Sequence, residues 1–528
     1  MPASREDWVS LFRPGSRVFI GSGASVPTAL VSRMLSVADQ LRDVELVHIH
    51  TQGRVPWVDP KYAESLRTNA FFLTPEVGKA VLEGRADYTP CSLSEVPGLF
   101  TSTILPIDVA LISVSPPDDS GKVSLGVSVD VALAAARSAR VVVAQINSHI
   151  PRTFGDSTLD TSEIDWFLEK DTQLVATPRA VAGPARKKIG AYLAEFVEDG
   201  STLQVGLGLT PAAAVRALKN HRHLGIHSGM FSDSLMELIT SGAVDNSRKG
   251  FKRGRSICSH ALGSRRLYRF THENPDLEFH PSEWVNDPLK IALNEKLIAV
   301  NGARQIDMVG QVVRDSFGDH FHGGIGAQLD FARGAAASPG GRSVHVMTST
   351  NEDESESRIV AVPDLGSVVS TGRTEVHYVI TEYGVATLRG RSIRERALEM
   401  IQVAHPKFRD ELMKGAHARG WLPKFVSVTP SHLKPEDTQS GVDFRRLSLG
   451  DDQRSFFLRS LHVSDMRRLQ EFFYSHSQET IQYRYGYQRD SMPPDSAYRL
   501  VGVDQSTDLA LGIFEERGAG AEPVLRAI

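Results

Sequence analysis

The sequence predicts an α/β protein built from two similar domains. Its main signal is a repeated pattern: residues 15–23 read Gly-Ser-Arg-Val-Phe-Ile-Gly-Ser-Gly, and residues 200–208 read Gly-Ser-Thr-Leu-Gln-Val-Gly-Leu-Gly. Each copy is a turn, a short apolar strand and a Gly-x-Gly loop, and each is followed by a proline and an alanine- and valine-rich helical run. Two such strand–loop–helix units indicate two α/β domains that begin alike.

Further apolar runs with strand character alternate with helical patterns such as residues 129–137. These runs cover residues 44–48, 109–114 and 141–146 in the first half and 224–226, 297–300, 344–347, 359–362 and 378–380 in the second. Strands that alternate with helices are typical of parallel sheets. We therefore expect a mostly parallel sheet in each of two domains, over residues 1–190 and 191–423.

A change of composition marks a boundary after residue 423. Residues 427–441 are rich in Ser, Thr, Pro, Lys, Glu and Asp and contain few apolar positions. This composition is typical of a linker. We expect a linker over residues 424–443 and a separate C-terminal segment over residues 444–528.

Composition excludes several classes of function. The 528 residues are 41% hydrophobic and 23% charged, which is ordinary for a globular protein, and the net charge of −4 provides no basic surplus for nucleic acid or anionic membranes. No apolar stretch is long enough to span a bilayer, and residues 1–10 lack the pattern of a signal peptide. Cys91 and Cys258 are too few for a disulfide framework or a four-thiolate zinc site. We expect a cytoplasmic protein without nucleic-acid or membrane partners.

The two Gly-x-Gly loops are candidate phosphate sites. A glycine loop lets the backbone approach a phosphate, and the following helix offers free N–H groups. Neither loop completes the dinucleotide fingerprint, because the third glycine position holds Val26 in the first copy and Pro211 in the second. A tight turn without a ligand explains each loop equally well, so the loops alone leave the function open.

Longer patterns in both halves resemble one enzyme family. In the first half these are residues 115–118 (Ser-Pro-Pro-Asp), 151–156 and 162–165 (Ser-Glu-Ile-Asp). In the second half they are residues 284–288 (Trp-Val-Asn-Asp-Pro), 324–334, 381–386 (Thr-Glu-Tyr-Gly-Val-Ala) and 404–409 (Ala-His-Pro-Lys-Phe-Arg). Taken in order over residues 5–423, they resemble acetyl-CoA hydrolase/transferase proteins, including 4-hydroxybutyrate CoA-transferases.

The resemblance implies two open α/β/α domains of the CoA-transferase type with an active site between them. In this family a glutamate attacks the thioester, CoA thiolate opens the resulting anhydride to a glutamyl-CoA thioester, and a carboxylate reverses these steps. Backbone amides stabilise the oxyanion. CoA is then a substrate and not a permanently bound cofactor, a carboxylate is the second substrate, and family analogy suggests an assembly of identical chains. No metal is implied, because Asp319, His320 and His322 lack further ligands at convincing spacing.

The residues expected to bind CoA follow position by position from the resemblance. They are the loop residues Gly206, Leu207, Gly208, Leu209 and Thr210, together with Arg304, Gly326 and Ala327. Ala327 stands where the family has the second glycine of a pair. A contact through the backbone N–H tolerates alanine if φ at this position is allowed for it.

The position of the family nucleophile holds Gly229. The family reads His-Ser/Thr-Glu-Met where residues 227–230 read His-Ser-Gly-Met. Glycine provides no carboxylate, so the covalent exchange cannot proceed as it does in the family.

Three hypotheses remain open at this position. Another carboxylate fills the gap, with Glu95, Asp233 and Glu237 as candidates; Glu95 also has a counterpart in members that keep their nucleophile, and the other two also fit a helix start. Alternatively, water occupies the vacated space, oriented by His227, although a structural histidine at a strand end explains His227 better. Finally, the site binds CoA esters without turnover.

Residues 457–461, 469–473 and 477–484 resemble the opening of a GNAT N-acetyltransferase domain. The loop that binds the acetyl-CoA pyrophosphate in that fold would be residues 517–522 (Arg-Gly-Ala-Gly-Ala-Glu), which departs from the motif at its last position. The sequence ends at Ile528, before a helix could follow this loop. We expect a small, incomplete GNAT-like α+β segment without acetyltransferase activity of its own.

The sequence therefore supports two classes of function. The first is an enzyme, either an acyl-CoA:carboxylate CoA-transferase or a hydrolase of small acyl-CoA thioesters such as acetyl-CoA. The second is a non-catalytic protein that binds CoA esters or regulates their use.

Overall fold

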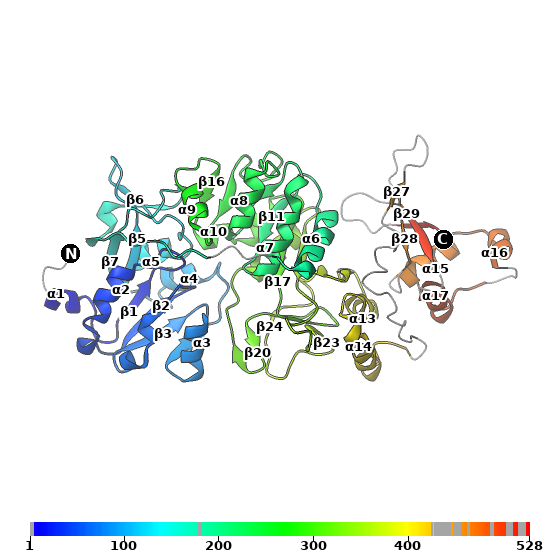
Figure 1. The fold of residues 1–528 in the computed structure, drawn as a ribbon, viewed down its shortest axis with the longest axis horizontal. Coiled ribbons are helices and arrows are strands. Elements are labelled where there is room, and N and C mark those ends of the chain that lie inside the picture. The colour runs from blue at the N-terminus through cyan, green and yellow to red at the C-terminus, as the bar shows by residue number, and fades with distance from the viewer. Residues whose placement is uncertain are drawn as a thin grey trace. The chain divides into compact units, whose positions relative to one another are not determined.

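The computed structural model describes residues 5–177, 182–423, 426, 445–447, 456–461, 465–485, 490–502, 510–515 and 524–528. The chain divides into two compact units (Figure 1). The first comprises Met1–Ile306, Gln311–Thr348 and Pro363–Glu382, and the second comprises Asp307–Gly310, Ser349–Val362 and Tyr383–Ile528. The first unit contains both Gly-x-Gly loops.

A seven-stranded, wholly parallel sheet forms the N-terminal half of the first unit, in the order β10-β7-β5-β1-β2-β3-β4. Its strands are β1 (Arg17–Ile20), β2 (Val44–His48), β3 (Leu66–Ala70), β4 (Ala86–Tyr88), β5 (Val109–Val114), β7 (Val141–Ile146) and β10 (Trp166–Glu169). The accompanying helices are α1 (Arg5–Ser10), α2 (Thr28–Leu35), α3 (Pro75–Leu82), α4 (Val96–Thr101) and α5 (Ala132–Ser138). All six residues of β5 are buried, as expected for a strand covered on both faces.

The second sheet runs in the order β12-β11-β17-β22-β25 within the first unit, again with parallel neighbours. Its strands are β11 (Thr202–Val205), β12 (Gly225–Ile226), β17 (Leu297–Gly302), β22 (Arg342–Val346) and β25 (Tyr378–Thr381). The helices are α6 (Pro184–Phe196), α7 (Leu209–Val215), α8 (Asp233–Thr240), α9 (Arg265–Thr271), α10 (Ser282–Val285), α11 (Pro288–Ala292) and α12 (Gln328–Ala337). The prediction of an α/β fold with parallel sheets is confirmed.

The predicted domain boundary between residues 190 and 191 lies inside α6. Gly190 of this helix lies close to α7, because a Cβ at Gly190 would come within 3.3 Å of the Ala214 carbonyl oxygen. Helix α6 therefore packs with the second sheet's helices. By packing, the second half starts near Pro184, where a proline in the first turn begins the helix.

Smaller strands complete the first unit and connect its halves. They are β6 (Lys122–Ser124), β8 (Phe154–Gly155), β9 (Thr158–Asp160), β13 (Met230–Phe231), β14 (Ser256–Cys258), β15 (His260–Ala261), β16 (Leu277–Phe279), β19 (Val312–Val313), β20 (Ser316–Phe317), β21 (His320–Phe321) and β24 (Val369–Thr371). Strand β8 from the first half pairs with β16 from the second. The approach is close: a Cβ at Gly155 would lie 2.3 Å from the Phe279 carbonyl oxygen, so only glycine fits there.

Strand order reverses at the glycine loop in each sheet. On one side of β1 lie β2, β3 and β4, and on the other lie β5, β7 and β10; β11 likewise separates β12 from β17, β22 and β25. Open α/β sheets bind ligands at the carboxyl ends of strands flanking such a reversal. Both loops follow the carboxyl end of the strand at which the order turns, so both lie where sheets of this class bind ligands.

The second unit contains the remaining elements. Its strands are β23 (Ile359–Val360), β26 (Gly384–Thr387), β27 (Arg445–Leu447), β28 (Phe456–Ser460), β29 (Leu511–Glu515) and β30 (Val524–Ala527), with β18 (Gln305–Asp307) shared between the units. Its helices are α13 (Ile393–Gln402), α14 (Pro406–Ala418), α15 (Met466–Tyr474), α16 (Gln478–Tyr485) and α17 (Pro494–Val501). A Ser392–Glu395 capping box begins α13. Strands β27 to β30 form an antiparallel sheet in chain order, while the predicted linker, except Val426, and the 517–522 loop lie outside the described residues.

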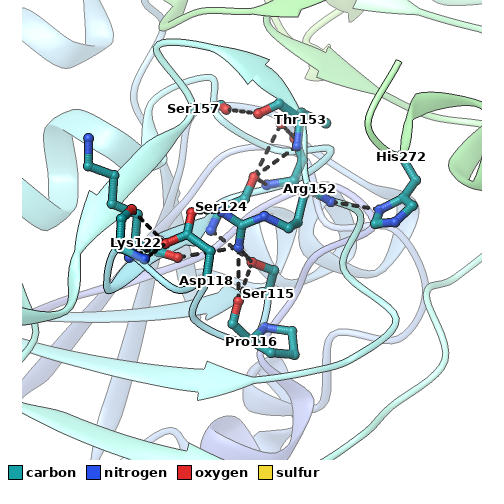
Figure 2. A network of polar contacts seen from close by, with 11 residues as sticks. Ser115, Pro116, Asp118, Lys122, Ser124, Arg152, Thr153, Ser157 and His272 are labelled. Atoms are coloured by element: carbon teal, nitrogen blue, oxygen red, sulfur yellow. Dashed lines mark hydrogen bonds and ion pairs between the residues drawn. The ribbon is translucent and has the colours of Figure 1, made fainter. Parts of the chain in front are cut away.

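Arg152 anchors the motif at residues 115–118 (Figure 2). Its guanidinium donates to the carbonyl oxygen of Pro116 at 3.0 Å and forms an ion pair with Asp118. Nearby, the Ser124 hydroxyl accepts from the backbone N–H groups of Gly126 at 3.1 Å and Thr153 at 3.2 Å (Figure 2). The network fixes the start of the loop that leads from β6 to α5.

We expect Arg152→Lys to lower the free energy of unfolding by about 1–3 kcal/mol, because a lysine cannot reproduce the planar fork that serves a carbonyl and a carboxylate together. Urea denaturation followed by circular dichroism measures this change. Arg13→Lys, a substitution of an exposed arginine, is the control and should change stability by less than about 0.5 kcal/mol. Equal stability of the two variants would contradict the role of Arg152.

Candidate active site

A cavity of about 110 Å³ opens where the carboxyl ends of the two sheets meet. It is lined by residues from both glycine loops, from the segments that follow β2 and β3, and from β17. The lining comprises Ser22, Gly23, Ile49, His50, Phe71, Phe72, Cys91, Leu93, Val96, Asp130, Gln204, Val205, Gly206, Leu207, Gly229, Met230, His260, Leu262, Asn301, Arg314, Ile325, Gly326, Ala327, Gln328 and Phe331. The two points of strand reversal thus share one cavity.

The loop at residues 206–210 contributes its first two residues to this lining. Gly206 is required by packing, since a Cβ there would lie 2.5 Å from Asn301 Oδ1. Asn301 is held in turn by two reciprocal amide bonds of 3.2 Å with Gln204. Gly208 adopts a φ of 139°, which favours glycine. Leu209 is exposed, and Thr210 is buried with its hydroxyl accepting from Arg186.

The loop at residues 323–327 forms another wall. Gly326 has a φ of 61°, whereas Ala327 has a φ of −107°, which any residue adopts. Alanine is therefore compatible with the backbone where the family has glycine. Ala327 is the N-cap of α12, and the first N–H groups of a helix have no partner within it. This end of α12 faces the cavity through Gly326, Ala327 and Gln328 and can accept developing negative charge.

Arg304 lies at a second cavity of about 280 Å³. Basic groups from three segments share its lining, which comprises Leu73, Thr74, Pro75, Gly78, Lys79, Leu82, Arg304, His320, Phe321 and His322. The two cavities are neighbours along the chain, because Phe72 lines the first and Leu73 the second. The structure thus separates Arg304 from the first cavity but keeps it close to the 323–327 loop.

Gly229 forms a bare part of the first cavity's wall. Its backbone is not in the left-handed region. A Cβ at this position would lie 3.0 Å from Asn286 Oδ1 and 3.6 Å from Phe331 Cε2, so a side chain fits with a small shift of the amide. Asn286 is fully buried, and neither its Oδ1 nor its Nδ2 has a hydrogen-bond partner among the described residues. The glycine therefore stands beside an unsatisfied amide.

His227 is fully buried outside this cavity's lining. Its Nε2 lies 2.8 Å from the Val285 carbonyl oxygen and its Nδ1 lies 3.1 Å from the Asn294 amide nitrogen. Burial lowers the pKa of His227 to about 3, which keeps the ring neutral. Both ring nitrogens are engaged by the protein, so in this structure the ring does not reach the cavity.

The candidate replacement carboxylates do not line the cavity either. Glu95 is exposed at the start of α4, where its Oε2 lies 3.9 Å from the Sγ of the lining residue Cys91. The Asp233 carboxylate accepts a hydrogen bond from the Ser264 N–H at 2.8 Å. Glu237 forms a 2.9 Å ion pair with Arg216. Of the three, only Glu95 is within one contact of the lining.

Sequence reasoning missed Asp130 and His260. Both line the cavity, and burial raises the pKa of Asp130 to about 6 and lowers the pKa of His260 to about 4. Asp130 precedes α5 and is 5% exposed, with Oδ1 accepting from the N–H groups of Val131 at 2.6 Å and Ala132 at 3.2 Å. A polar residue before an alanine-rich helical run is typical of a cap, so the local pattern gave no other signal.

Within the described residues, no group of three or more His, Cys, Asp or Glu side chains is arranged to hold a metal. Among the helices that the structure describes, none is both long and apolar enough to cross a membrane.

The fold and the cavity define an α/β enzyme of the CoA-transferase class. RipA from Yersinia pestis superimposes with a TM-score of 0.75 at 32% identity, over 80% of this chain and 98% of RipA. A 4-hydroxybutyrate CoA-transferase from Porphyromonas gingivalis superimposes with a TM-score of 0.67 at 33% identity, over 79% and 96% of the two chains. A 4-hydroxybutyrate coenzyme A transferase from Clostridium kluyveri is 41% identical over 77% of this chain and 95% of its own.

Family models agree with this class. The acetyl-CoA hydrolase/transferase N-terminal domain matches residues 3–177, and the C-terminal domain of the same family matches residues 263–416. The chain belongs to the acetyl-CoA hydrolase/transferase family. It is thus an enzyme of acyl-CoA transfer or hydrolysis, and the family's substrates are CoA thioesters.

We expect Gly206→Ala to lower the free energy of unfolding by about 1–3 kcal/mol, because the added Cβ displaces the Gln204–Asn301 amide pair at the cavity. Urea denaturation measures the loss. Gly98→Ala on α4 is the matched control, since a Cβ there meets no atom within 4 Å and alanine favours a helix. If Gly206→Ala is as stable as the parent, the expected clash between the Cβ and Asn301 does not occur.

Proposed function

We propose that the chain hydrolyses small acyl-CoA thioesters, with water in the place of the family glutamate. The observation that carries the proposal is the bare wall at Gly229 beside the unpartnered amide of Asn286. A buried amide without a partner costs about 1–3 kcal/mol, and a bound water removes this cost. Water held there lies at the position from which the family's carboxylate would attack.

The proposed substrate spans both cavities. The acyl group and the thioester occupy the first cavity, whose small volume suits a short acyl chain. The 206–210 loop and the start of α12 approach the thioester, while the phosphates of CoA extend toward Arg304 and Lys79 in the second cavity. Adjacent lining residues, Phe72 and Leu73, support one ligand reaching both.

CoA transfer to a carboxylate is the second candidate. It is favoured by the relatives, which include the 4-hydroxybutyrate coenzyme A transferase of Clostridium kluyveri and a succinyl-CoA:acetate/propanoyl-CoA:succinate CoA transferase of Fasciola hepatica, 39% identical over 82% of this chain. Transfer needs a nucleophilic carboxylate, and Glu95 is the exposed candidate closest to the lining, through Cys91.

We infer further that CoA acts as a substrate only, that the enzyme works in the cytoplasm and that identical chains assemble. The support is the family's chemistry, the two unpaired thiols Cys91 and Cys258, and analogy with the family. We assign residues 444–528 to a GNAT-like segment. In support, β27 to β30 form an antiparallel sheet, and α15 packs against β30 and α17.

Incubation of the pure protein with acetyl-CoA, propionyl-CoA and butyryl-CoA should release free thiol without a carboxylate acceptor. Ellman's reagent measures the thiol, and calorimetry with CoA measures binding. Thiol that appears only together with a new thioester, on addition of acetate or 4-hydroxybutyrate, would favour transfer. If no thiol and no new thioester form from any of these substrates while CoA still binds, both enzymatic proposals are overturned and a CoA-ester-binding protein remains.

We expect Gly229→Glu to acquire acceptor-dependent CoA transfer, because the backbone at residue 229 permits a side chain and Asn286 needs only a small shift. A glutamyl-CoA thioester should then form, and borohydride reduction followed by mass spectrometry of the peptide detects it. Gly229→Gln is the matched control, of equal size but without a nucleophilic oxygen. If the glutamate variant behaves like the glutamine variant, the cavity has diverged from the family beyond this residue.

A further inference from the structure

Asp130 is a carboxylate in the first cavity that the family mechanism does not use. Its backbone is fixed on both sides: its N–H donates to the Ser259 carbonyl oxygen at 3.1 Å, and its carbonyl oxygen accepts from the Ser282 N–H at 2.9 Å. Its Oδ1 accepts from two backbone N–H groups. Its Oδ2 makes no hydrogen bond or ion pair with the part of the chain that the structure describes, although the residue is only 5% exposed. One carboxylate oxygen is thus anchored and the other is available.

Asp130 and Gly229 lie on opposite sides of one short segment. The Ser259 N–H donates to the Gly229 carbonyl oxygen at 3.0 Å, and the Ser259 carbonyl oxygen accepts from Val129 at 3.2 Å and from Asp130. Two inter-strand spacings therefore separate the backbones of residues 130 and 229, roughly 9.5 Å. Both residues line the same cavity. The backbone of Ser259 lies between the two residues, so the space for a water and the carbonyl carbon of a thioester is the cavity that both residues line.

We infer that Asp130 is the catalytic general base that activates the attacking water over Gly229. The inference rests on the proposed hydrolysis. The water lies between the free Oδ2 of Asp130 and the unpartnered side-chain amide of Asn286. Ser282 links the two residues: its N–H donates to the Asp130 carbonyl oxygen, and its carbonyl oxygen accepts from the Asn286 N–H at 2.9 Å. Asp130 therefore transfers the proton, and the water rather than a side chain attacks the thioester.

The proposed hydrolysis passes through a tetrahedral oxyanion. Asp130 takes a proton from water as the water oxygen bonds to the thioester carbon, and the carbonyl oxygen becomes an oxyanion held by the N–H groups at the start of α12. The oxyanion collapses, the C–S bond breaks, and the leaving CoA thiolate takes the proton from Asp130. This transfer returns Asp130 to its ionised state, and the acid product loses its remaining proton to solvent.

The surroundings of Asp130 keep it suitable for this role near neutral pH. Burial raises its pKa to about 6, so the carboxylate is mostly ionised at pH 7 yet basic enough to accept a proton. His260 and His50 share the lining and are neutral, since burial lowers the pKa of each. Arg314 and Cys91 are the other titratable groups of the lining. Outside the lining, Glu283 on α10 interacts electrostatically with Asp130.

Asp130→Asn tests the inference, because the amide oxygen still accepts from Val131 and Ala132 while the basic oxygen is lost. We expect thiol release from acetyl-CoA to fall by about 10²–10⁴-fold, with CoA affinity and thermal stability close to those of the parent. In the parent, kcat rises as pH increases through about 6 and then levels, because the base must be ionised. In Asp130→Asn this inflection disappears.

Asp330→Asn is the matched control. Burial also raises the pKa of Asp330 to about 6, but this carboxyl bonds Ser94 and is not part of the cavity lining. The control should keep both the rate and the inflection.

Three results would overturn the role of Asp130 while the parent still hydrolyses acyl-CoA. These are an unchanged rate in Asp130→Asn, loss of activity in Glu95→Gln with Asp130→Asn active, or exchange of labelled CoA into acyl-CoA. The last would reveal a covalent acyl-enzyme. A parent that binds CoA but releases no thiol overturns hydrolysis itself, and with it the base.

Discussion

Backbone hydrogen bonds between the two halves of the first unit are the constraint on which the site depends. The N–H groups of Val129 and Asp130 bind the Ser259 carbonyl oxygen, and the Ala261 N–H binds the Val127 carbonyl oxygen. Such pairing has a fixed spacing and direction. It places the carboxyl ends of β1 and β11 at one cavity, and without it each sheet would carry half a site. The backbones of Gly155 and Phe279 form a second close contact between the two halves.

Local patterns predicted the elements of the first unit well. Strands β2, β5 and β7 have the bounds that their residues indicated, because β-branched runs are short-range signals. The domain boundary was less visible. Helix α6 belongs by packing to the second half, as contacts such as that of Gly190 with Ala214 reveal.

The candidate site could be predicted only in part. Gly206, Leu207, Gly229, Gly326 and Ala327 all line the cavity. Their positions follow strand ends and family patterns, which are readable along the chain. The proximity of Asp130 and Asn286 to Gly229 could not be predicted, because it is created by tertiary pairing through Ser259 and Ser282. A sequence shows that a nucleophile is missing, but it does not show which distant groups face the gap.

The glycine at residue 229 changes what the scaffold can contribute to catalysis. A glutamate attached to the wall attacks with the large effective concentration of a tethered group, whereas a water must first be bound and deprotonated. Hydrolysis on this scaffold should therefore be slower than transfer by relatives that keep their glutamate. The proposed oxyanion donors at the start of α12 and the 206–210 loop, proposed to approach CoA, do not depend on residue 229. Turnover then depends on how well the remaining polar groups position one water molecule.

Exclusion of solvent from the cavity explains the remaining electrostatics with a single cause. Burial raises the pKa of Asp130 and lowers the pKa values of His50 and His260, so the histidines stay neutral. Asp130 and Arg314 are then the ionised groups of the lining and carry opposite charges, which suits the entry of an uncharged thioester. The same burial strengthens the interaction between an oxyanion and the start of α12. A water that enters this space meets polar side chains such as Gln204 and Asn301, and the available oxygen of Asp130 is the anionic acceptor of the lining.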